Sequence, residues 1–275
     1  MKQAIDHTIR FLLFSNCWVA LSVGMLVTGL THHHGIHSAF YWGFFAFSGT
    51  FVTYNFHRLV RHKSFETAQI ITDRGRWLDQ HRTLIFVCTA IFAITAIALF
   101  FTFPIRLSSL WVLAVAGTIV MGYALPIPLL GKSLRDISGL KGLWITLVWV
   151  LLLYFPLLQY DYAIDYADLA VIGMFTFVQI IPFDIRDLSY DATSMKTLPQ
   201  LIGVRGAQIV GTLLTVSLVY IVLLLHPFHY LLPVIALLTL IGLWWKQTPQ
   251  RLHLLEFIWD GTLIVLGLYY YLISG

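Results

Sequence analysis

The sequence predicts an all-α polytopic membrane protein with about nine transmembrane helices, and three observations lead to that prediction. Of the 275 residues, 59% are hydrophobic and only 11% are charged, too few to cover the surface of a soluble protein of this size. Apolar stretches long enough to cross about 30 Å of hydrocarbon recur along the whole chain. The Lys and Arg residues gather in alternate connections between these stretches, as expected for the loops on one side of a membrane.

The apolar stretches define the expected spans. No Asp, Glu, Lys or Arg occurs between Arg10 and Arg58, and Thr31–His37 divides this segment into two spans. Proline and glycine mark several later boundaries, among them Pro104, Pro126 and Gly206. The spans are predicted at roughly 11–30, 38–55, 83–103, 107–125, 142–160, 166–183, 207–225, 229–245 and 254–273.

The basic residues predict the orientation of these spans. With nine spans, all 17 Lys and Arg residues except Arg106 fall on the same side of the membrane. The positive-inside rule then places the N-terminus in the cytoplasm and the C-terminus outside. A pI near 9.1 is explained by these loops, so we expect no nucleic-acid partner. We expect an integral protein of the bacterial inner membrane, in contact with membrane lipids.

A cluster of three carboxylates stands out in this apolar chain. Asp184, Asp187 and Asp191 lie at the end of the sixth span, where a long cytoplasmic loop begins. Their i, i+3, i+7 spacing would place all three on one face of a helix, about one turn apart. Ionisable groups at the edge of a membrane core are functional candidates, and Mg²⁺ prefers a few carboxylates together with phosphate oxygens and water. The cluster therefore predicts a site for Mg²⁺ and a diphosphate.

A second cluster lies at the corresponding end of the second span. Asn55, Arg58 and His62 repeat the spacing of the three aspartates, with Arg61 nearby. This suggests one transmembrane domain, 1–275, built from two pseudo-repeated halves at roughly 1–135 and 136–275. Two simpler interpretations stay open. In the first, the aspartates form a solvated loop with an internal Arg186 ion pair. In the second, Arg58 pairs with Asp187 and blocks metal binding.

The residues around the acidic cluster resemble a known family. Asp184-Ile-Arg-Asp-Leu-Ser-Tyr-Asp191, followed by Lys196-Thr-Leu-Pro199 and Gly203, resembles the second aspartate-rich motif of UbiA-type intramembrane prenyltransferases. Tyr123-Ala-Leu-Pro126 with Lys132 resembles the loop between the family's fourth and fifth helices. The resemblance implies nine helices around a central cavity, with cytoplasmic loops after the second, fourth and sixth.

The first acidic motif departs from the family pattern. The family has Asn-Asp-x-x-Asp at the end of its second helix, whereas this chain keeps Asn55 and has Phe56 and Leu59 in place of the acids. The usual site, with Mg²⁺ bridging a diphosphate from both motifs, is therefore in question. Arg58 is a candidate to replace the missing metal.

The resemblance implies a prenyltransferase that moves a prenyl group from an isoprenyl diphosphate to a lipophilic or aromatic acceptor. A non-catalytic relative that binds an isoprenoid or quinone is the alternative, because the first-motif acids are missing. A transporter ranks third, since the charged residues lie at one mouth rather than at the midplane. The candidate residues are Asp187, Asp191, Arg58 and Asn55 for catalysis; Lys132, Lys196, Arg186, Arg61 and Tyr123 for the diphosphate; and Asp184, Asp187 and Asp191 for Mg²⁺.

Overall fold

The computed structural model is built of helices, as the sequence predicts. It describes residues 2–66, 73–103, 105–162, 166–189, 196–225, 231–245 and 252–273, in which one isolated bridge between Ile127 and Lys132 is the sole β pairing. The chain folds into two compact units. Unit 1 comprises residues 1–106 and 248–275, and unit 2 comprises residues 107–247.

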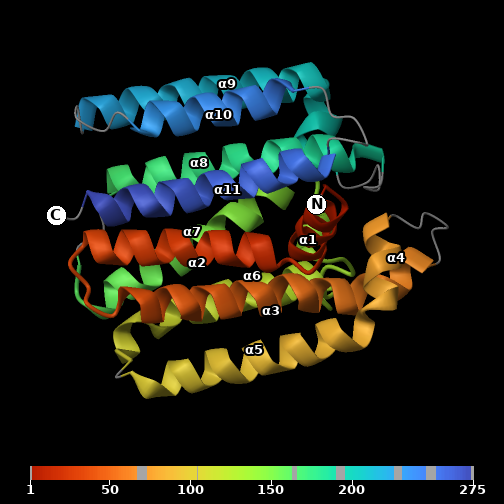
Figure 1. Ribbon diagram of the computed structural model, residues 1–275, viewed down its shortest axis with the longest axis horizontal. Helices are drawn as coiled ribbons and strands as arrows, with labels where there is room; N and C mark the ends of the chain where they lie inside the picture. Colours follow the sequence, from red (N-terminus) through yellow and green to blue (C-terminus); the bar gives the residue numbers. More distant parts are fainter. Residues whose placement is uncertain are drawn as a thin grey trace. The chain divides into compact units, whose positions relative to one another are not determined.

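Unit 1 contains a row of long helices and two shorter ones. Figure 1 shows α11, α2, α3 and α5 side by side, in agreement with the contacts between successive members of this row. The helices are α1 (Lys2–Phe14), α2 (Cys17–His33), α3 (Ala39–Glu66), α4 (Asp73–Gln80), α5 (Arg82–Thr102) and α11 (Leu252–Leu272).

Unit 2 contains five long helices, each in contact with the next along the chain. The helices α6, α7, α8, α9 and α10 pack in sequence order, and Figure 1 shows α9 beside α10. Their bounds are α6 (Leu110–Ala124), α7 (Lys141–Gln159), α8 (Tyr166–Arg186), α9 (Leu198–Leu225) and α10 (Leu231–Trp244), with short 3₁₀ turns η1 (Leu107–Ser109), η2 (Leu134–Asp136) and η3 (Asp187–Ser189).

Each of the nine expected spans overlaps one of the helices α2, α3 and α5–α11. Within the described residues, six helices are long and apolar enough to cross a membrane, or seven if the bent pair α1 and α2 forms one span. The chain is therefore an integral, multi-pass membrane protein, and the count of nine stays a prediction. The first span differs from expectation, because the helix breaks at Ser15 and Asn16 and turns by 70°.

Small residues allow the neighbouring helices of unit 1 to pack closely. A Cβ atom built on Gly29 of α2 would lie 1.9 Å from the carbonyl oxygen of Gly267 in α11. A Cβ atom built on Gly43 of α3 would lie 1.8 Å from Oγ1 of Thr28. Small residues allow helices to approach this closely, which matters in lipid because dispersion contacts replace the hydrophobic effect as the source of helix association.

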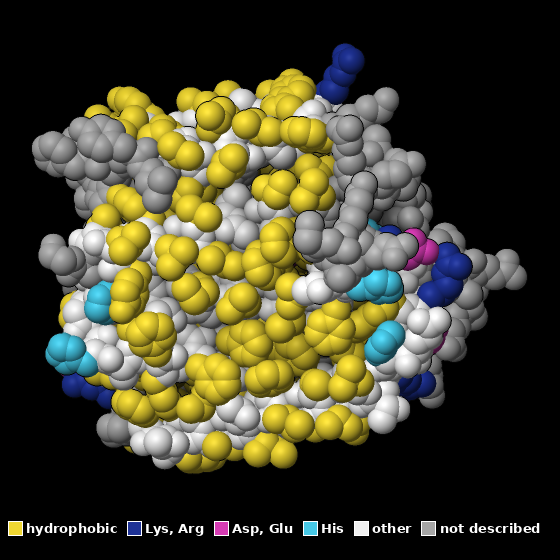
Figure 2. Space-filling model, viewed as in Figure 1, with side chains coloured by type: hydrophobic (Ala, Val, Ile, Leu, Met, Phe, Trp, Pro, Cys, Tyr) yellow, Lys and Arg dark blue, Asp and Glu magenta, His cyan; other side chains and the backbone are white. Residues whose placement is uncertain are grey.

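The outer surfaces of the helices are apolar. Phe86, Ile94 and Phe101 of α5 are each more than half exposed, as are Leu213 and Tyr220 of α9. Figure 2 shows hydrophobic side chains over most of the visible face, with Lys, Arg, Asp and Glu near the ends of the helices. This distribution fits helices whose middle portions contact lipid.

The two units are defined by contacts, whereas the halves 1–135 and 136–275 were proposed from a repeat. Their boundaries differ, because α11 joins the N-terminal helices in unit 1. The repeat and the single-domain assignment stay predictions.

Candidate functional site

Asn55 lies at the break between α1 and α2. It is fully buried in α3, and its side-chain Nδ2 donates to the carbonyl oxygens of Ser15 and Phe51, at 3.0 Å each. Its Oδ1 accepts a hydrogen bond from Nδ2 of Asn16 at 2.9 Å. Asn16 has a left-handed backbone with φ 60°, a conformation that Asn tolerates better than most residues. Asn55 therefore satisfies polar groups that the break exposes.

Two arginines cap the end of α1 at the same place. Arg58 Nη1 donates to the carbonyl oxygen of Phe14 at 3.4 Å. Arg74 Nη2, from α4, donates to the carbonyl oxygen of Leu13 at 2.6 Å and to Oδ1 of Asn16 at 2.8 Å. The carbonyl end of a helix attracts cations, so both arginines are electrostatically well placed. Arg61 lies in α3, and its side chain is outside the described part of the structure.

Two of the predicted diphosphate contacts lie at the end of α6 and in the loop that follows it. Tyr123 lies in the last turn of α6 and is half-buried. Lys132 closes a tight turn, where its carbonyl oxygen accepts from the N–H of Ile127 at 3.0 Å while its side chain is exposed. Gly131 permits this turn, because its φ of 62° is strained for other residues.

The acidic cluster does not continue as one α-helix. Asp184 lies in the last turn of α8, whereas Asp187 follows the helix and begins η3. Asp191 lies outside the described residues. The expected i, i+3 placement on one helical face is therefore interrupted between the two described aspartates.

Asp187 and Asp184 each bind a cation of their own unit. The Arg186 guanidinium contacts both carboxylate oxygens of Asp187, with Nε 2.6 Å from Oδ1 and Nη2 3.0 Å from Oδ2. Arg186 also lies over the ring of Phe183, 5.0 Å from its centroid. Asp184 Oδ1 lies 2.8 Å from Nζ of Lys141, the first residue of α7. Both members of this second pair are buried.

The segment that resembles the family's Lys-Thr-Leu-Pro element forms the start of α9. Lys196 is exposed, with φ 44°, and its carbonyl oxygen accepts from the N–H of Gly139 at 3.0 Å. The N–H of Thr197 donates to Oε1 of Gln200 at 2.9 Å, which is half of a capping box. Pro199 fits in the first turn, where its missing N–H removes no helical hydrogen bond.

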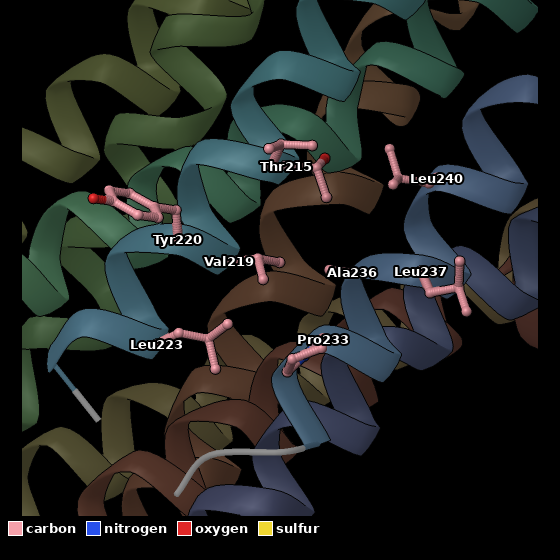
Figure 3. Close-up of a pocket in the computed structure, with 9 residues that line it drawn as sticks. Thr215, Val219, Tyr220, Leu223, Pro233, Ala236, Leu237 and Leu240 are labelled. Carbon is pink, nitrogen blue, oxygen red and sulfur yellow. The ribbon is translucent and has the colours of Figure 1, made fainter. Parts of the chain in front are cut away.

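An apolar groove lies between α9 and α10, within unit 2. Its volume is about 390 Å³, and Figure 3 shows Val219 and Leu223 lining it from α9 and Pro233 and Leu240 from α10. It begins at Thr215, at most about 26 Å along α9 from Leu198 at 1.5 Å per residue. None of the described residues that line the groove is charged.

Comparison with known proteins identifies the fold. No protein-family model matches the sequence, and no curated protein matches it. A UbiA homologue from Archaeoglobus fulgidus bound to DMAPP and Mg²⁺ superposes with a TM-score of 0.63 and 15% identity, covering 96% of this chain and 99% of that chain. A UbiA homologue from Archaeoglobus fulgidus bound to GPP and Mg²⁺ gives a TM-score of 0.61 at 14% identity, covering 95% of this chain and 99% of that chain. This chain has the UbiA fold.

Mg²⁺ in this UbiA fold would need hard oxygen donors from the acidic motif. The carboxylate of Asp187 is such a donor, and its side chain is 26% exposed. The Asp184 carboxylate is engaged by Lys141 instead, so its metal role stays a prediction. Among the described residues, no group of three or more His, Cys, Asp or Glu side chains is arranged to hold a metal.

The sequence analysis missed three of the polar contacts found in this UbiA fold. It treated Arg74 and Lys141 only as cytoplasmic positive charges and assigned no role to Asn16. Each binds a residue at least 39 positions away, a separation that no local spacing rule detects. The contact between Thr197 and Gln200 could have been predicted from the sequence, because Thr followed by Gln three residues later matches a capping box.

Proposed function

We propose that this protein transfers a prenyl group from an isoprenyl diphosphate to a lipophilic or aromatic acceptor inside the membrane. The observation that carries the proposal is the acidic motif at the end of α8 in a chain with the UbiA fold. Homologues with that fold are bound to DMAPP and Mg²⁺ in one structure and to GPP and Mg²⁺ in another. The helices, apolar outside with charged ends, suit a substrate with a lipid-like tail and a charged head.

The proposed reaction breaks the bond between the first carbon of the prenyl chain and the diphosphate oxygen. The diphosphate leaves with the bonding electron pair, the acceptor forms a new bond to that carbon, and the acceptor's proton passes to water. When bound, Mg²⁺ would neutralise the departing diphosphate. Arg186, Lys196 and Lys132 would contribute fixed positive charge from unit 2.

For unit 1 we propose that Arg58 and Arg61 bind diphosphate oxygens in place of first-motif metal ligands. Guanidinium groups offer paired donors that match phosphate oxygens. For Asn55 we propose a positioning role, because its amide donates to the carbonyl oxygen of Ser15, next to the Phe14 carbonyl that Arg58 contacts. Tyr123 stays a candidate for the substrate side of the loop between α6 and α7.

The first experiment measures binding of a non-hydrolysable isoprenyl diphosphate to the purified full-length protein, with and without Mg²⁺. We expect Mg²⁺-dependent binding to the wild type and its loss in Asp187→Ala/Asp191→Ala. The matched control, Asp73→Ala/Asp79→Ala, removes two exposed carboxylates from α4 and should bind as the wild type does. Binding that is indifferent to Mg²⁺ and to the motif variant would refute the proposal.

A non-catalytic isoprenoid- or quinone-binding role is the second candidate. The ion pairs at both described aspartates favour it, together with Phe56 and Leu59 at the first-motif positions. A screen of aromatic and lipid acceptors with labelled isoprenyl diphosphate separates the two roles. Formation of a prenylated product supports the enzyme, whereas binding without release of diphosphate supports the second role.

For the topology we propose a cytoplasmic N-terminus and an external C-terminus in a bacterial inner membrane. The one-sided distribution of Lys and Arg supports this orientation. A reporter fused after residue 275 should be active only outside the cytoplasm. A cytoplasmic signal would overturn the orientation.

A further inference from the structure

Of the two ion pairs described at the acidic motif, the pair between Lys141 and Asp184 is the more deeply buried. The lysine side chain is 8% exposed and the aspartate side chain 5%, with Nζ and Oδ1 separated by 2.8 Å. A buried carboxylate is costly unless a cation or several hydrogen bonds compensate it. Because the sequence places Asp184 in a metal motif, the lysine occupies a position where a metal ion was expected.

The backbone around Lys141 holds the lysine in this position. Gly139, with φ 77°, donates its N–H to the carbonyl oxygen of Lys196, which ties the start of α7 to the segment entering α9. On the other side of Lys141, a Cβ atom built on Gly142 would lie 3.1 Å from Cε2 of Phe177 in α8. The residues on either side of Lys141 therefore contact α8 and the segment that leads into α9.

The helix ends make the pair asymmetric. Lys141 begins α7, and a cation in the first turn of a helix is disfavoured by the helix dipole, whereas a carboxylate near that end is favoured. Asp184 supplies this carboxylate from α8. The lysine is thus an unfavourable residue for its own helix, and its position is explained by the aspartate it compensates.

We propose that Lys141 is the resident cation of the acidic motif, taking the place of a divalent metal at Asp184 and fixing the end of α8. This inference rests on the proposed function for its role in catalysis. Among the described aspartates, Asp187 is then the one left for the metal. Arg186 contacts both of its carboxylate oxygens, and metal binding there would release Arg186 for the diphosphate. Lys141 is a positioning residue in this scheme and contacts no substrate.

The decisive test needs no substrate. The midpoint of thermal unfolding is measured with EDTA and with MnCl₂ for full-length Lys141→Met and for Lys141→Met/Asp184→Asn, both of which keep Asp187 and Asp191. We expect Mn²⁺ to raise the midpoint of Lys141→Met by several degrees more than that of the double variant, because only the single variant leaves Asp184 uncompensated. Equal Mn²⁺ shifts in the two variants would overturn the proposal.

A second comparison serves if Lys141→Met does not fold. Asp184→Asn should show the same Mn²⁺ shift as the wild type, because Asp184 binds no metal while Lys141 is present. A smaller shift in Asp184→Asn would identify Asp184 as a metal ligand and overturn the proposal. Lys141→Arg keeps the positive charge and should behave as the wild type in this measurement.

Binding of the isoprenyl diphosphate analogue gives the functional readout. We expect the Mg²⁺ concentration for half-maximal binding to change less than two-fold in Lys141→Met/Asp184→Asn and to rise ten-fold or more in Asp187→Asn. A ten-fold rise in the double variant would contradict a resident cation. If the wild type binds no analogue, the proposed function fails, while the Mn²⁺ comparison still decides whether Lys141 replaces a metal.

Discussion

The side-chain amides of Asn16 and Asn55 meet across the break between α1 and α2, with Nδ2 of Asn16 2.9 Å from Oδ1 of Asn55. Asn55 returns two hydrogen bonds to backbone carbonyls, and Arg74 donates to Asn16 from the other side. This chain of hydrogen bonds links α3, the break and α4. Asn55, which the sequence analysis assigned to catalysis, thus also stabilises the packing of α3 against the break.

Asn55→Ala should therefore lower the stability of the protein. The substitution leaves buried polar groups of Asn16 and Ser15 without their partner, at a cost of about 1–3 kcal/mol per unsatisfied group. Thermal unfolding in detergent measures the loss, with Thr53→Ala on the same helix as the control. A variant that keeps its unfolding midpoint but no longer binds the diphosphate analogue would instead favour the substrate contact predicted from the sequence.

Arg74→Met should loosen the end of α1. The arginine binds the carbonyl of Leu13 and the amide of Asn16 with one nitrogen, and its guanidinium lies 5.9 Å from the ring centroid of Phe14. Hydrogen exchange followed by mass spectrometry should be faster over residues 7–16 in this variant. Arg76→Met is the control, because Arg76 pairs with Asp73 at the exposed surface. Unchanged exchange at the break would contradict the capping role.

Gly29→Ala should disrupt the packing of α2 on α11. The new Cβ atom would lie 1.9 Å from the carbonyl oxygen of Gly267, so the helix backbones must separate. We expect a lower unfolding midpoint and a lower yield of monodisperse protein on size-exclusion chromatography. Gly49→Ala in α3 is the matched control, since nothing lies within 4 Å of its new methyl group and alanine favours helix. Equal behaviour of the two variants would refute the close contact.

Arg186→Lys should weaken binding of the diphosphate analogue about ten-fold or more, because lysine lacks the planar fork that binds oxygens in pairs. Arg186 makes two contacts with Asp187 and lies over Phe183, so its donors are oriented next to the acidic motif. Isothermal titration of the analogue in the presence of Mg²⁺ measures the change. The control is Arg205→Lys, at an exposed position of α9, which should keep the wild-type affinity.

The positions of the long helices were predictable because a helix that crosses lipid needs a long run of apolar residues, which can be read directly from the sequence. The break at Asn16 was not predictable in this way, since residues 11–30 carry no charge and the break depends on Asn55 and Arg74. The acidic motif was found from local spacing, but its partner Lys141 is brought to it by the packing of α7 on α8. Local pattern located the helices, the acidic motif and a possible ion pair with Arg186, which forms at the neighbouring Asp187. Tertiary contact brings Lys141 to Asp184.

Unit 1 is discontinuous in the chain, with α11 completing a row that begins at α2. During synthesis Gly29 of α2 is made early, but Gly267, which it contacts, is made only after the whole of unit 2. All of unit 2 is therefore synthesised while unit 1 still lacks α11. The helix α11 thus completes a unit whose other helices precede unit 2 in the chain.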